Sequence, residues 1–191
     1  KFDTGHIFAQ QSISLHPTDT RESLYTKLYD LGGQLTTQTL NLYIEWEQTG
    51  AINKLDDQNV NLYLPPKPQN STSKPYARLI NKDETYLPWE FINNALLGKD
   101  LTPNNQVPVI FQPILNSPEI QDSTYYIHLI ERAVRAFFGW PGVWTMINTE
   151  KGPKRLKILS STVRDNKLVL DLVQLEGKTP QHFSEIKHLI L

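Results

Sequence analysis

The sharpest short motif in the sequence is Asp3-Thr4-Gly5, which could hold a carboxylate in a tight turn. One chemistry for this motif is that of an aspartic protease, in which two carboxylates share one proton because adjacent like charges cannot both ionise. The sequence has no second copy of the motif, so such a protease would have to be a homodimer. The alternative is a structural turn, in which the Asp side chain bonds its own backbone and glycine supplies a positive φ. On the motif alone, the structural turn is the better interpretation.

Two clusters of basic residues could contact phosphate groups. Residues 65–82 contain no acidic residue, and their basic members are Lys67, Lys74, Arg78 and Lys82. A second cluster falls on a predicted turn and strand and consists of Lys151, Lys154, Arg155 and Lys157. Lys and Arg bind nucleic-acid backbones by displacing counterions. The clusters indicate a phosphate-binding surface, and the alternative is a solvated linker followed by a charged hairpin.

The residue patterns that several other chemistries require are absent from the sequence. The chain has no cysteine, so disulfides and thiolate metal sites are excluded. Its five histidines show no metal-ligand spacing, and no glycine-rich phosphate loop or Gly-x-Ser-x-Gly motif occurs. We therefore expect no metal site.

The elements that must position these residues fall into two parts of different charge. Residues 1–64 carry four basic and eight acidic residues, whereas residues 65–191 carry fifteen basic and twelve acidic ones. The division falls at Pro65-Pro66-Lys67-Pro68 and the polar stretch after it, a composition typical of an extended linker. We expect domains at 1–64 and 76–191, joined by a linker at 65–75.

The pattern of the first part predicts one short strand between Ile7 and Leu15 and two helices. Asp19-Thr20 can cap the first helix, and its apolar residues recur at helical spacing. Gly32-Gly33 should end or bend that helix, and a second is expected over 35–48, with Gly50 as its stop. One strand and two helices cannot form a sheet domain, so we expect the tail of an α/β domain.

The second part predicts a helix over 123–138, then short strands at 143–147, 156–160 and 168–175. Strands at this spacing suggest a small antiparallel barrel. Thr179-Pro180 should open a last helix. Residues 91–122 fit neither pattern, and their Asn and Pro residues predict a long surface insertion.

Composition limits the classes of protein to which the chain could belong. The 191 residues are 39% hydrophobic with a net charge of −1, which allows a sizeable core and excludes a uniformly basic nucleic-acid coat. No apolar run reaches the ~18 residues of a membrane helix, so we expect no membrane partner. Because the chain opens at Lys1 and its only methionine is Met146, we expect a fragment or a processed product.

Five short motifs follow one another along the chain. They are Phe2-Asp3-Thr4-Gly5; Thr20 with Leu24-Tyr25, Lys27-Leu28 and Leu31-Gly32; Tyr76-Ala77-Arg78-Leu79 with Trp89; Arg135-Ala136-Phe137 with Trp140-Pro141-Gly142; and Val173-Gln174-Leu175-Glu176-Gly177-Lys178 with Phe183. In this order they resemble the later part of methionyl-tRNA formyltransferases. The sequence departs from that family in a longer region between Trp89 and Arg135 and in Pro88, where an Asp is expected. The family's Asn-x-His segment and folate pocket would fall before residue 1.

The resemblance implies transfer of a formyl group from 10-formyltetrahydrofolate to the α-amine of initiator methionyl-tRNA, without a metal. Asp3 would be the catalytic aspartate that sets the protonation of the family's histidine. The implied fold is the α/β tail of a Rossmann-like formyltransferase domain, followed by a small antiparallel OB-like β-barrel with flanking helices. That barrel would help to hold the tRNA, and the residues expected to bind it are Lys74, Arg78, Lys82, Lys151, Lys154, Arg155 and Lys157. By itself the chain is expected to be inactive.

Three other functions stay open: an amino-sugar formyltransferase, an RNA-binding module without catalysis, and the dimeric aspartic protease. We expect a monomer that binds neither DNA nor membranes. The compartment would be the mitochondrial matrix in a eukaryote, which the insertion favours, or the cytoplasm of a bacterium.

Overall fold

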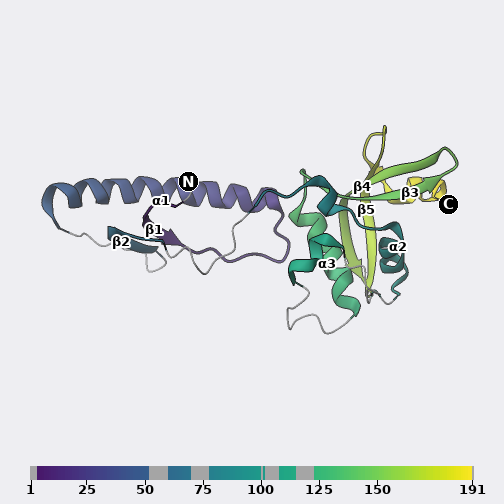
Figure 1. Cartoon of the computed structure of the whole chain (residues 1–191), viewed down its shortest axis with the longest axis horizontal. Coiled ribbons are helices and arrows are strands. Elements are labelled where there is room, and N and C mark those ends of the chain that lie inside the picture. Colours follow the sequence, from purple (N-terminus) through teal and green to yellow (C-terminus); the bar gives the residue numbers. More distant parts are fainter. Residues whose placement is uncertain are drawn as a thin grey trace. The chain divides into compact units, whose positions relative to one another are not determined.

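The computed structural model describes residues 4–51, 60–69, 78–99, 101, 108–114 and 123–190. The chain divides into two compact units, residues 1–78 and 79–191, and each is described by itself (Figure 1). None of the helices in these described ranges has the length and hydropathy needed to span a bilayer.

The first unit combines one long helix with a two-stranded antiparallel sheet. Strand β1 covers Ile7–Gln11, helix α1 covers Arg21–Thr49 and strand β2 covers Val60–Lys67. β1 pairs with β2, from Gln11 opposite Val60 to Ile7 opposite Lys67. Strand β2 was not predicted, because its prolines indicated a linker. Residues 65–67 of that expected linker form the end of β2, where proline is tolerated since both strands are edge strands; residues 70–75 lie outside the described ranges.

Helix α1 is continuous, so the prediction of two helices separated at Gly32-Gly33 is wrong. Glycine inside a helix is unfavourable by only about 1 kcal/mol relative to alanine, and helix-forming residues continue on both sides. The residue that ends the helix is Gly50, as predicted. It adopts φ 69°, and its N–H donates to the Trp46 carbonyl at 2.8 Å. A left-handed backbone, rather than the presence of glycine, determines where α1 stops.

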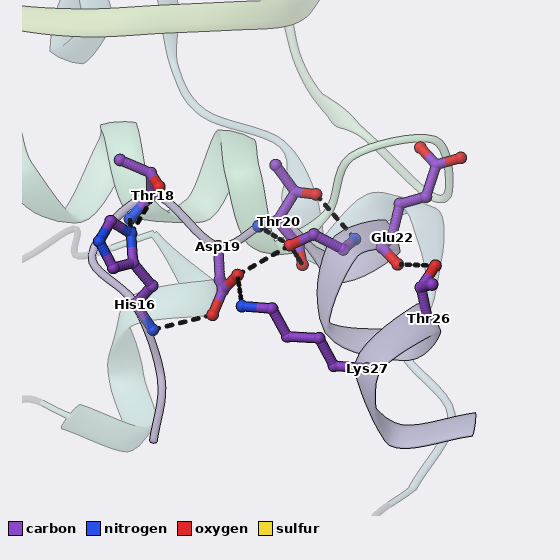
Figure 2. Close-up of polar contacts among 8 residues, drawn as sticks. His16, Thr18, Asp19, Thr20, Glu22, Thr26 and Lys27 are labelled. Atoms are coloured by element: carbon purple, nitrogen blue, oxygen red, sulfur yellow. Dashed lines mark hydrogen bonds and ion pairs between the residues drawn. The ribbon is translucent and has the colours of Figure 1, made fainter. Parts of the chain in front are cut away.

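The beginning of α1 is fixed by a capping network that confirms the predicted cap (Figure 2). Thr20 Oγ1 accepts from the Ser23 N–H at 3.1 Å, and Ser23 Oγ accepts from the Thr20 N–H at 3.0 Å. Asp19 accepts from Lys27 Nζ at 2.6 Å and from the His16 N–H at 2.8 Å. These bonds, that from Lys27 first, lower the pKa of Asp19 from 3.8 to about 2.

The second unit is a four-stranded antiparallel sheet with helices packed against it. Its strands are β3 (Val143–Thr149), β4 (Gly152–Arg164), β5 (Lys167–Leu175) and β6 (Gln181–His182), paired in the order β3-β4-β5-β6. Its helical segments are η1 (Lys82–Thr85), α2 (Trp89–Leu97), η2 (Val109–Ile114), α3 (Ser123–Ala136), α4 (Phe183–Ile186) and η3 (Lys187–Leu189). Helix α3 packs against β4, and α2 packs against β5 (Figure 1). The predicted antiparallel strands and the helix at 123 are confirmed.

One turn and one short strand pairing define the later part of this sheet. Asp165 and Asn166, at φ 50° and 56°, join β4 to β5 in a tight turn. Beyond β5, Gln181 and His182 pair with Val173 and Leu172, so the last helix is capped by His182 and not by Thr179 as predicted. Strand pairing takes the residues that would have formed the first turn of that helix.

The core of the second unit lies between its sheet and its helices. Leu87, Ile130, Val143, Leu156 and Val173 are fully or almost fully buried there. The described strands run consecutively, and in these residues β3 and β6 do not pair with each other, so the sheet is antiparallel but closure into a barrel is not seen.

The expected surface insertion at 91–122 contributes to that core, so its surface location is wrong for four of its residues. Ile92 and Ala95 of α2, together with Leu101 and Phe111, are at most 3% exposed. The apolar residues of Trp89–Leu97 recur at helical spacing, and the Asn pair within that segment concealed the pattern. Residues 100, 102–107 and 115–122 lie outside the described ranges.

Candidate nucleic-acid interface

The residues predicted to carry the chemistry are distributed over both units. Asp3 and Lys74 lie outside the described residues. Arg78 is exposed and is the last residue of the first unit. The other five predicted basic residues belong to the second unit: Lys82 begins η1, Lys151 lies in the β3–β4 turn, and Lys154, Arg155 and Lys157 lie on β4.

Strand alternation decides which of these side chains share a face. Val143, Thr145 and Ile147 of β3 are buried, so Trp144 and Met146 point outward. In the antiparallel register Trp144 is opposite Lys157, and Met146 is opposite Arg155. The outer face of this hairpin therefore presents two cationic side chains beside a Trp and a Met.

Lys154 belongs to the other face of the hairpin. It pairs with Ile147, a buried residue, and its neighbour Leu156 is also buried. Lys151 is exposed at the turn. The second basic cluster, continuous in sequence, is thus divided by the strand geometry, which places Arg155 and Lys157 together and Lys154 opposite them.

A cleft of about 200 Å³ lies on the outer face, and we refer to it as the tryptophan cleft. Its lining residues are Lys82, Trp140, Pro141, Trp144, Arg155 and Lys157. Three of them are predicted phosphate-binding residues, and none of the six is acidic. The cleft thus joins basic residues from η1 and from β4, which are far apart in the sequence.

Trp144 is the anchor of the cleft. Its indole Nε1 donates to the Lys82 carbonyl at 2.9 Å, and its own carbonyl accepts from the Leu87 N–H at 2.9 Å. The guanidinium carbon of Arg155 lies 4.2 Å from the centroid of the Trp144 ring, a cation–π contact. The Tyr86 ring lies 4.8 Å from the same indole. These contacts hold the 82–87 segment against β3 and fix the position of the Arg155 charge.

The turn at 139–142 forms the next wall of the cleft. Lys157 Nζ donates to the Gly139 carbonyl at 3.2 Å. Gly142 adopts φ 78°, and a Cβ at this position would lie 2.1 Å from Lys157 Cε. The buried hydroxyl of Thr85 lies 2.7 Å from the Gly142 carbonyl oxygen. The turn favours glycine because of its positive φ, and a Cβ here would displace the end of the Lys157 side chain.

An acidic residue borders the cleft without lining it. Glu176 Oε2 accepts from the backbone N–H of Arg155 at 3.2 Å, and the Glu176 N–H donates to the Arg155 carbonyl at 2.9 Å. Glu176 therefore bonds the backbone of Arg155, while the guanidinium lies on the Trp144 ring.

The aromatic half of this site was not predicted from the sequence. Trp140 is 48% exposed and Trp144 is partly exposed, although tryptophan is usually well buried. Trp140 was noted only as part of a family motif. The available signal was the alternation along β3, where Trp144 and Met146 fall on the face opposite Val143, Thr145 and Ile147.

No metal cluster is present in the part of the chain that the structure describes. A second cavity, of about 360 Å³, lies in the first unit between β1 and α1 and is lined mainly by apolar and threonine side chains. His6 and Tyr43 also line this cavity.

Comparison with known proteins points to the same family as the motifs. No protein-family model matches the chain. It is 28% identical to a methionyl-tRNA formyltransferase of Pseudoalteromonas translucida (strain TAC 125) over 69% of the chain and 35% of the relative. It is 27% identical to that of Myxococcus xanthus (strain DK1622) over 85% of the chain and 35% of the relative. It is 26% identical to that of Methylacidiphilum infernorum (isolate V4) over 96% of the chain and 49% of the relative.

The resemblance to methionyl-tRNA formyltransferases is confirmed. The chain spans between about a third and a half of the length of these formyltransferases. The match to the Methylacidiphilum infernorum formyltransferase covers 96% of the chain and so includes most of both units.

Proposed function

We propose that this chain takes part in the transfer of a formyl group from 10-formyltetrahydrofolate to the α-amine of initiator methionyl-tRNA, and that its second unit holds the tRNA. The observation that carries the proposal is the tryptophan cleft, which joins Lys82, Arg155 and Lys157 on one face of the second unit. Such a face suits a phosphate backbone, because the cations replace counterions that the nucleic acid releases. The similarity to methionyl-tRNA formyltransferases supports a tRNA as the nucleic acid.

The remaining basic residues extend this proposed surface. We propose Lys151 and Lys154 as further phosphate contacts at the end of the β3–β4 hairpin, and Arg78 and Lys74 as contacts from the segment before the second unit. In this proposal residues 1–64 belong to a Rossmann-like catalytic domain and residues 76–191 form an OB-like domain; of the expected 65–75 linker, residues 65–67 instead end β2 of the first unit. The protein acts as a monomer, in the mitochondrial matrix of a eukaryote or in the cytoplasm of a bacterium.

The role proposed for Asp3 is to assist proton transfer from the attacking amine. The amine nitrogen of the methionyl group attacks the formyl carbon, and a tetrahedral oxyanion forms. The bond from the formyl carbon to the donor nitrogen then breaks, and that nitrogen gains a proton as the amine loses one. The attacking amine must lose a proton, and a carboxylate that orients a histidine assists this loss. The oxyanion needs hydrogen-bond donors beside it. Asp3 by itself provides neither the catalytic histidine that it would orient nor the hydrogen-bond donors to the oxyanion. We therefore expect that residues 1–191 alone do not catalyse the transfer.

The tRNA proposal is tested by titrating the chain with labelled methionyl-tRNA at several salt concentrations, and with a nucleotide-linked amino sugar in parallel. The proposal predicts tRNA binding that weakens steeply with salt and no binding of the amino sugar. Binding of the amino sugar without binding of tRNA would contradict it and would favour the amino-sugar formyltransferase.

A further inference from the structure

We propose that the tryptophan cleft binds one unstacked nucleotide of an RNA strand, with its base against Trp140 and its phosphate among Lys82, Arg155 and Lys157. This inference rests on the proposed function and deepens it. The proposed function requires only phosphate contacts, whereas the cleft adds recognition of a base that has left its helical stack.

Trp140 is the more exposed of the two tryptophan side chains that line the cleft. It is 48% exposed and lines the cleft. Trp144 is more covered, since the Arg155 guanidinium lies 4.2 Å and the Tyr86 ring 4.8 Å from its own ring. Aromatic side chains bind unpaired bases by stacking, with little preference for sequence. We therefore assign stacking to Trp140 and the positioning of Arg155 to Trp144.

The charges of the cleft fit a phosphate next to that base. Lys82, Arg155 and Lys157 line the same space as Trp140, and none of the described residues that line it is acidic. Two of these groups are held in place, Arg155 by the Trp144 ring and Lys157 by the Gly139 carbonyl. A nucleotide combines an aromatic face with an adjacent negative charge, and this is the combination that the lining presents.

The size of the cleft restricts the ligand further. Its volume of about 200 Å³ is below the roughly 300–1,000 Å³ of sites for drug-sized ligands. A single base with its neighbouring phosphate is of the size that such a cleft accommodates, while the rest of the strand would lie outside it. A base inside a duplex keeps both faces stacked, so only a nucleotide of a loop, a bulge or a single-stranded end can enter.

The test measures binding of the chain to a labelled single-stranded RNA dodecamer, to the same strand annealed as a duplex, and to a free mononucleotide. Trp140→Leu should weaken binding to the single strand by about tenfold, and Trp140→Phe should restore most of it, because phenylalanine still stacks. Phe138→Leu is the matched control, since Phe138 is 40% exposed and does not line the cleft. It should bind like the unmodified chain.

Trp140→Leu should also leave the salt dependence of binding unchanged, because it removes no charge. Equal affinities of the Trp140→Leu and Phe138→Leu variants would overturn the inference, as would a duplex bound as tightly as the single strand. A mononucleotide bound as tightly as the RNA would overturn the assignment to a strand. Trp140→Phe and circular dichroism of each variant separate impaired stacking from impaired folding.

Failure of the inference and failure of the proposed function give different results. If the unmodified chain binds tRNA with steep salt dependence and Trp140→Leu does not change its affinity, only the stacking assignment fails. If the unmodified chain binds no tRNA at all, the proposed function fails.

Discussion

At the residue scale, Gly142 connects the backbone of the Trp-Pro-Gly turn to the position of a charge. Its φ is 78°, and an added Cβ would meet Lys157 Cε at 2.1 Å. Gly152 provides a matched comparison, since its φ is 92° but nothing lies within 4 Å of an added Cβ. The two glycines separate backbone strain from interference with Lys157.

We expect Gly142→Ala and Gly152→Ala each to lower the free energy of unfolding by about 1 kcal/mol or more, because alanine is strained at a positive φ. Only Gly142→Ala should also weaken RNA binding, because it displaces Lys157 from the cleft. Urea unfolding and RNA titration of both variants check this. Equal RNA affinities of the two variants would show that Gly142 does not position Lys157 for binding.

Asp3 is the residue on which the proposed catalysis depends. In a protein that carries the complete formylation activity, Asp3→Asn should lower kcat by about 10²–10⁴-fold, the usual contribution of a general acid–base group. Binding of tRNA should change little, because the variant leaves the basic residues intact. Steady-state kinetics with methionyl-tRNA give both quantities. Near-normal turnover would remove Asp3 from the mechanism, and a peptidase activity abolished by the same change would favour the aspartic protease.

At the scale of elements, the start of α1 depends on the ionised form of Asp19. Its lowered pKa of about 2, against 3.8 ordinarily, means that the folded chain binds this proton more weakly than the unfolded chain. The stabilisation is therefore complete above about pH 4 and is lost as the pH falls through 2. Asp19→Asn should remove this contribution at neutral pH and flatten the dependence of stability between pH 4 and 2.

Urea unfolding at pH 6, 4, 3 and 2, followed by far-ultraviolet circular dichroism, measures that dependence. Glu22→Gln is the control, because Glu22 lies in the first turn of the same helix and accepts none of the bonds made to Asp19. If Asp19→Asn and the unmodified chain lost stability in parallel over this range, the network at Asp19 would have no role in the acid sensitivity.

The continuity of α1 predicts that one glycine substitution raises the free energy of unfolding. Gly32 and Gly33 lie inside the helix, and an added Cβ meets nothing within 4 Å at either position. Gly32→Ala should raise the free energy of unfolding by about 0.4–1 kcal/mol, because alanine restricts the unfolded chain. Gly50→Ala should lower it, since Gly50 is held at φ 69°. Urea unfolding of both variants checks the pair, and a loss of stability in Gly32→Ala would indicate a bend at that position.

These elements also show what could be read from the sequence. The strands from Val143 onward, the helix at Ser123 and the cap at Thr20 follow from period and local chemistry, which act over a few residues. Strand β2 could not be predicted, because it exists through pairing with β1, a strand distant in the sequence, and its prolines argued against it. Helix α2 has a helical period, but its Asn pair and the prolines after it favoured a loop.

At the scale of the whole molecule, the chain is two separate units, and the candidate site lies entirely in the second. The basic residues of this site were predicted from their clustering. Their division between two faces of β4, and their association with Trp140 and Trp144, required strand register and the approach of residue 82 to residue 144. Contacts over such sequence distances are determined by the folded core and cannot be read from spacing.

We propose that the outer face of the β3–β4 hairpin binds tRNA phosphates. The most direct measurement compares the salt dependence of tRNA affinity for two double variants of equal charge change. One is Arg155→Gln with Lys157→Gln, in the tryptophan cleft. The other is Lys167→Gln with Lys187→Gln, outside it.

The cleft variant should show a slope of log affinity against log salt that is shallower by roughly 0.7–0.9 for each phosphate that the protein no longer neutralises, and it should bind all tRNAs more weakly to a similar extent. The control variant should keep the slope of the unmodified chain. Equal slopes for the two double variants would contradict the claim and would leave Arg155 and Lys157 as ordinary solvated residues of a charged hairpin.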